Sequence, residues 1–179
     1  MFETAILDVL VGLVLIYLLL SLSEHYNAWR WLGWALLPTA YLWVMAQASR
    51  LPWPVAGFER EYRLWAAAPL AASMLAWFWL ANANSAGDSD PLPYLPLINP
   101  LELGLLLCLG ALFVWARDAL PRLSLQPARA QQVVQGVAGL SLFALLTVMV
   151  MRSAHHWGDV PWQTSALFES MLVQAGWSI

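Results

Sequence analysis

The side chains best suited to chemistry lie in one short stretch near the end of the sequence, AHHWGDVP, at residues 154–161. This stretch contains His155, His156 and Asp159. Neutral imidazoles bind transition-metal ions or haem iron, and a histidine beside an acid can move protons. The pair also resembles the His-His-x-x-x-Asp signature of acyl transfer, but Asp159 comes one residue too early for it.

The spacing of the histidines argues against a shared ion. Adjacent side chains on a helix point about a hundred degrees apart, so we do not expect His155 and His156 to bind one ion together. A ligand from His25, the only other histidine, would then be required. We therefore predict histidines with a structural role at the membrane interface, and neither a metal ion nor a cofactor.

Two acids lie inside apolar stretches, Asp8 and Glu102. Both sit near expected helix starts, where a carboxylate reaches the interface and meets the positive end of the helix dipole. We therefore predict that both are solvated. Glu102 is nevertheless the fourth candidate catalytic residue, after His155, His156 and Asp159, because ionisable groups within membrane helices are often functional.

The elements that carry these residues are apolar and long. The chain is 61% hydrophobic and 11% charged, against roughly 45–50% and 25% in an ordinary soluble domain. Five stretches approach the length that crosses a bilayer, at about residues 6–22, 31–48, 64–81, 101–116 and 133–151. Residues 164–179 form a sixth, partial or interfacial helix. The predicted fold is all-α, a polytopic transmembrane helical bundle in a single domain over residues 1–179.

The arginines orient this bundle. Six of the eight lie in two connections, residues 49–63 and 117–131, whereas residues 82–99 hold no basic residue and contain Asp88 and Asp90. Because cytoplasmic loops retain arginine and lysine, the first two connections and the N-terminus should be cytoplasmic and the third outside. Richness in Arg, Ala and Leu without any Lys favours a bacterial inner-membrane protein. A net charge of -3 without a basic face excludes nucleic-acid binding.

Small residues mark expected packing faces. Ala68, Ala72 and Ala76 recur every four residues in the third stretch, and Gly104 and Cys108 do so in the fourth. Small side chains let another helix approach closely, so we predict a compact bundle or partner helices within the bilayer. The proline-rich stretch DPLPYLPLINP, residues 90–100, cannot be helical. It is either a rigid, partly buried connector with apolar residues at the membrane surface or a lid over an outward cavity.

Three stretches together resemble the bacterial Domain of Unknown Function 2339 family: RLPWPVAGFEREY (50–62), DPLPYLPLINPLEL (90–103), and AHHWGDVPW with LFESMLVQAGWSI (154–162 and 167–179). The resemblance covers about residues 45–179, and the first helix, up to Leu22, does not resemble the family. It implies a part of a longer inner-membrane protein with many helices. The family has no established activity, so no site residue follows from it.

These observations favour an integral inner-membrane protein without catalytic activity, a structural or interaction subunit of a larger envelope assembly. Its expected partners are the lipid bilayer and other transmembrane helices or membrane subunits. The alternative is an outward-facing membrane enzyme or transporter that uses His155, His156, Asp159 and Glu102.

Overall fold

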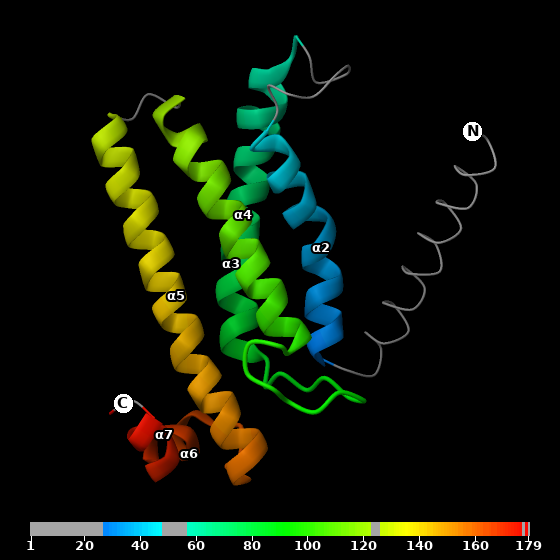
Figure 1. Ribbon diagram of the computed structural model, residues 1–179, viewed down its shortest axis with the longest axis vertical. Helices are drawn as coiled ribbons and strands as arrows, with labels where there is room; N and C mark the ends of the chain where they lie inside the picture. The colour runs from blue at the N-terminus through cyan, green and yellow to red at the C-terminus, as the bar shows by residue number, and fades with distance from the viewer. Residues whose placement is uncertain (1–26, 48–56, 123–125, 177, 179) are drawn as a thin grey trace, which may run out of the picture.

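The computed structural model describes residues 27–47, 57–122, 126–176 and 178, and every regular element among them is a helix. The elements are α2 (Asn27–Met45), η2 (Glu61–Ala66), α3 (Ala67–Asn84), α4 (Pro100–Arg122), α5 (Pro127–Gly158), α6 (Thr164–Glu169) and α7 (Met171–Gly176). Helices α2, α3 and α4 pack together, and α5 runs obliquely beside them, with α6 and α7 against its C-terminal end (Figure 1). The predicted all-α fold is confirmed for this part of the chain.

Three of the described helices are long and apolar enough to cross a membrane: Glu61–Asn84, Pro100–Arg122 and Pro127–Gly158. Within the described residues the structure thus supports three of the five predicted spans. The predicted span at 6–22 lies outside the described residues. The second predicted span corresponds to α2, a helix of 19 residues that includes Arg30, Pro38 and several tryptophans, which lower its mean hydropathy.

The helix ends also differ from the prediction. Helix α4 continues past the predicted residue 116 to Arg122, and α5 has 32 residues instead of the predicted stretch 133–151. In both helices, turns with polar residues extend the helix beyond its apolar centre. The predicted sixth helix over residues 164–179 is two short helices, separated at Ser170.

The predicted packing face of α4 is confirmed within the described chain, whereas the alanine stripe of α3 is not covered by another helix of that part of the chain. Cys108 is fully buried, and a Cβ at Gly104 would lie 2.9 Å from Leu32 Cδ1, so α2 approaches α4 closely there. On α3, by contrast, Ala72 and Ala76 are exposed. The buried face of α3 is formed by Ala67, Ala71, Met74, Phe78, Ala81 and Asn82. Since nearly every position of α3 is small or apolar, a four-residue spacing does not set which side faces the core.

The two ends of the bundle differ in charge. Arg63, near the start of the α3 span, forms an ion pair with Asp118 of α4, and Arg122 pairs with the same carboxylate. The indole of Trp115 donates to the Arg63 carbonyl at 2.8 Å, which ties α4 to the same end. The loop formed by residues 85–99 lies at the opposite end (Figure 1). The described arginine-bearing connections therefore share one end of the bundle, as the charge pattern predicts.

Candidate functional site

Glu102 lies beneath the loop of residues 85–99 and is fully buried. Its Oε1 accepts a hydrogen bond from the Tyr94 hydroxyl at 2.6 Å, and its Oε2 accepts one from the Leu97 N–H at 2.6 Å. The prediction of a solvated carboxylate is therefore wrong. The loop folds back over the first turn of α4 and covers the acid, which the position of Glu102 near a helix start does not reveal.

Arg152 of α5 is the counter-ion of Glu102 and is also fully buried. Its Nη1 lies 3.7 Å from Glu102 Oε1, while Nε donates to the Ser85 carbonyl and Nη2 to the Asn82 carbonyl, both at 3.0 Å. A guanidinium from α5 thus caps the C-terminal end of α3. Arg152 was not among the candidate residues that the sequence indicated. One sequence signal could have found it: Arg152 directly follows an apolar stretch, and a charged side chain that is buried at such a position needs an oppositely charged partner.

Tyr94 joins the loop to the end of α5. Its ring stacks on His156 with centroids 4.5 Å apart, and its carbonyl accepts a hydrogen bond from the Trp157 indole at 3.3 Å. Burial, and then the hydrogen bond to Glu102, raise the pKa of the Tyr94 phenol, so the hydroxyl stays protonated and donates. The apolar residues of this loop were expected at the membrane surface, but Tyr94 is buried. Only the neighbours Leu92, Leu95, Leu97 and Ile98 are exposed.

The two histidines occupy the last turn of α5 and contact backbone carbonyls. His155 Nδ1 lies 2.6 Å from the Val160 oxygen, and His156 Nε2 lies 2.9 Å from the Ala86 oxygen. Their ring centroids are 4.9 Å apart, so the two side chains converge rather than diverge. Asp159 is exposed and has a left-handed backbone, from which its N–H caps α5 at the Ala154 carbonyl.

The acid that groups with the histidines is therefore Asp88 of the loop rather than Asp159. Asp88 precedes them by more than sixty positions, so no local pattern could have selected it. His25, the third histidine, lies outside the described residues.

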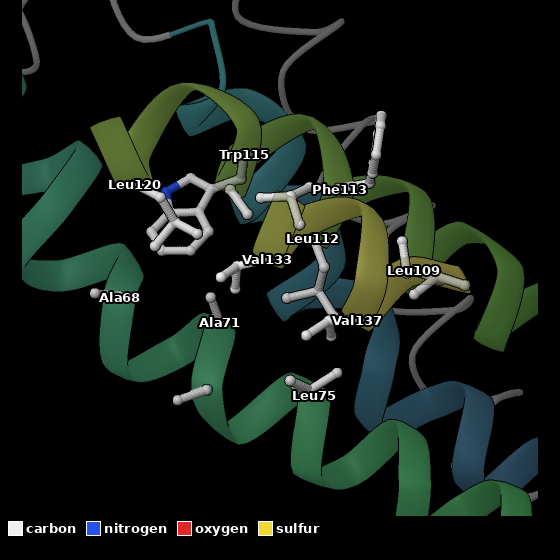
Figure 2. Close-up of a pocket in the computed structure, with 14 residues that line it drawn as sticks. Ala68, Ala71, Leu75, Leu109, Leu112, Phe113, Trp115, Leu120, Val133 and Val137 are labelled. Atoms are coloured by element: carbon white, nitrogen blue, oxygen red, sulfur yellow. The ribbon is translucent and has the colours of Figure 1, made fainter. Parts of the chain in front are cut away.

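An apolar groove of about 320 Å³ lies between α3, α4 and α5, toward the end of the bundle that carries the arginines (Figure 2). Its lining includes Ala68, Ala71 and Leu75 of α3, Leu112, Phe113 and Leu120 of α4, and Val133 and Val137 of α5. Only 17% of the most apolar stretch of α5 is buried against the rest of the described chain. The groove is thus bordered by the least covered of the long helices.

The model of a family described as predicted membrane protein (DUF2339) matches residues 2–179. The chain belongs to the DUF2339 family. The match includes the first predicted span, so the expectation that the stretch up to Leu22 falls outside the family is wrong. No curated protein and no solved structure matches the chain.

This DUF2339 chain therefore has two features of functional interest, and they differ in accessibility. In the polar cluster, Glu102 and Arg152 are fully buried, and both Glu102 oxygens accept hydrogen bonds from the loop. Such groups hold the loop in place. The groove is open, and its lining is almost wholly apolar, which suits contact with another apolar chain.

Proposed function

We propose that this DUF2339 chain is a non-catalytic helix-packing unit of a larger assembly in the bacterial inner membrane. The observation that carries the proposal is the open apolar groove beside the sparsely covered helix α5. Its occupant is a transmembrane helix of another subunit.

Small residues on both walls favour a helix as the occupant. Ala72 of α3 lines the groove and is exposed within the described chain. On α5, the small residue that lines the groove is Ala138. Alanine and glycine let helix backbones approach closely in a bilayer, where van der Waals packing drives association.

The orientation follows from the arginines. With the N-terminus and the arginine-bearing end cytoplasmic, the loop of residues 85–99 and the histidines face outward. The groove then lies in the cytoplasmic half of the membrane.

The burial of the polar cluster supports a structural role over the alternative of an outward-facing enzyme or transporter. A catalytic carboxylate must reach its substrate. Glu102 is covered by the loop, and its two oxygens are held by Tyr94 and by the backbone of Leu97.

The role of the groove is tested by placing leucine at one alanine inside it and at one alanine outside it. Ala72→Leu places a branched side chain in the groove, whereas Ala40→Leu makes the same change at an exposed position of α2 outside it. We expect Ala72→Leu to release a subunit that co-purifies with the wild-type chain in a fixed ratio in mild detergent. Ala40→Leu should retain that subunit, and both variants should keep the wild-type helix content.

A photo-crosslinking residue at position 72 separates a helix from lipid as the occupant. In native membranes it should give a discrete product, and mass spectrometry should place the crosslink in a membrane-spanning segment of the same subunit. Crosslinks to lipid alone, or to residues 6–22 of the same chain, would overturn the proposal. Equal retention of the subunit by both leucine variants would do so as well.

A further inference from the structure

We propose that Asp88, His155 and His156 bind a divalent transition-metal ion of the zinc class at the outer end of the bundle. One nitrogen of each imidazole and one carboxylate oxygen lie within 4.8 Å of one another. The residues come from two segments, the loop after α3 and the last turn of α5.

The hydrogen bonds of the imidazoles fit ligand roles. A carbonyl oxygen only accepts, so the ring nitrogens that face Val160 O and Ala86 O carry the protons. The other nitrogen of each ring then has its lone pair available. Histidines that bind metals commonly donate their second nitrogen to a carbonyl, which fixes the tautomer and the ring orientation. Stacking on Tyr94 further restricts His156.

Asp88 supplies the anionic ligand, and its side chain is free to rotate toward a bound ion. Its Oδ1 lies 3.8 Å from His156 Nε2, the nitrogen that faces the Ala86 carbonyl, and its side chain is 57% exposed. Tetrahedral zinc, with bonds of about 2.0–2.2 Å, holds its ligand atoms roughly 3.4 Å apart. To share an ion with the unprotonated nitrogens of the two rings, the carboxylate turns away from Nε2, and the exposure of the Asp88 side chain allows this turn without moving a helix.

The local charge permits a cation. The nearby guanidinium of Arg152 is paired with Glu102, so its charge is compensated. The loop itself carries Asp88 and Asp90 and no basic residue.

Two imidazoles and a carboxylate suit Zn²⁺, Co²⁺ or Fe²⁺ and leave further positions for water. A bound ion would join the loop to α5 and reinforce the hydrogen bonds from His156 and Trp157 to the loop.

The test uses the full chain, purified in detergent with a tag that contains no histidine, stripped of metal and titrated with Co²⁺ and Zn²⁺ alone. We expect one Co²⁺ per chain, visible by its d–d absorption and displaced by Zn²⁺. Asp88→Asn and His155→Gln should each weaken Co²⁺ binding at least about tenfold, since even residues behind the ligands contribute 10–100-fold. Asp90→Asn, at an exposed carboxylate two residues away, should leave the affinity unchanged.

Thermal melting of each variant without metal shows whether the fold is intact, and Asp88→Asn, at an exposed position, preserves the test if the histidine variant unfolds. Absence of Co²⁺ binding by the wild-type chain would overturn the proposal. Equal Co²⁺ affinities of the Asp88→Asn and Asp90→Asn variants would also overturn it. The same holds if Co²⁺ binding is lost in His25→Ala but unchanged in Asp88→Asn.

Discussion

Arg152 and Glu102 lie side by side in the interior of the chain, with Nη1 3.7 Å from Oε1 and both side chains fully buried. Each also holds part of the loop region: Arg152 the carbonyls at the end of α3, and Glu102 the segment before α4. The ionic contact joins α5 to α4, and the hydrogen bonds of Arg152 join α5 to the end of α3.

Removing the guanidinium of Arg152 should strongly destabilise the fold. Arg152→Met leaves Glu102 as a buried charge without its counter-ion, which costs about 3–5 kcal/mol of unfolding free energy. Denaturant titration in a fixed detergent measures the loss. Arg122→Met is the control, because that side chain is 55% exposed and its pair with Asp118 should contribute only about 0.2–1 kcal/mol. Equal losses in the two variants would show that the buried pair has no special weight.

Replacing Tyr94 with phenylalanine should reduce the loss of folding stability that occurs as the pH rises above neutral. Because the pKa of Tyr94 is raised, the protonated form is favoured in the folded chain, and its stabilisation is present below about pH 10 and lost above it. Tyr94→Phe should cost about 1.5–3 kcal/mol at neutral pH, since a donor to a carboxylate is lost. The gap in melting temperature between wild type and variant should then narrow as the pH rises past 10. A constant gap would contradict a protonated donor.

Contact between α2 and α4 predicts a steric effect at Gly104. A Cβ there would lie 2.9 Å from Leu32 Cδ1, so Gly104→Leu should overpack the interface and cost about 1–3 kcal/mol. Gly139→Leu is the matched control because a Cβ at that position meets nothing within 4 Å. Chemical unfolding of the isolated chain compares them, and a tolerated leucine at 104 would argue against the close approach.

Alanine substitutions at two glycines with positive φ distinguish the cost of backbone strain from the cost of side-chain crowding. Gly87 has φ +84 and a Cβ there would lie 3.2 Å from Arg152 Cδ, whereas Gly57 has φ +90 and open space. Alanine at either position should cost about 1–2 kcal/mol for the left-handed backbone. Gly87→Ala should lose more, because it also displaces the buried arginine. Identical melting temperatures for the two variants would contradict this added contact.

Membrane orientation is testable with single cysteines. Asp90→Cys should react with an impermeant thiol reagent added outside intact cells, and Arg122→Cys should react only after the membrane is opened. Both positions are exposed, whereas Ser89 is 3% exposed and would make a poor probe. Cys108 is buried and should give little background. The opposite labelling pattern would invert the proposed orientation.

Local pattern was sufficient for some of this architecture. Apolar length predicted helices, prolines predicted a non-helical stretch at residues 90–100, most of which lies in the loop of residues 85–99, and Gly104 with Cys108 predicted the α4 packing face. Each depends on neighbouring residues alone. The facing of α3 was not predictable, because alanine and leucine on all sides give no contrast between core and surface.

The candidate site depends on distant contacts, which a single sequence does not reveal. His155, His156 and Glu102 were found because their types are unusual in apolar surroundings. Arg152 and Asp88 were missed as partners because the contacts that define them join residues far apart in the chain. Burial of Glu102 follows from the path of the loop, which no pattern around residue 102 encodes.

The cap that Arg152 places on α3 also bears on how the chain is made. Its donors arrive 67 and 70 residues after the carbonyls they bind, so these bonds form only after α4 and most of α5 have been synthesised. Helix α3 is therefore synthesised before its C-terminal end has its final partners, and until then the loop cannot close over Glu102 in its final arrangement. A polypeptide stalled before residue 152 should therefore expose this loop to protease, and completion of α5 should protect it.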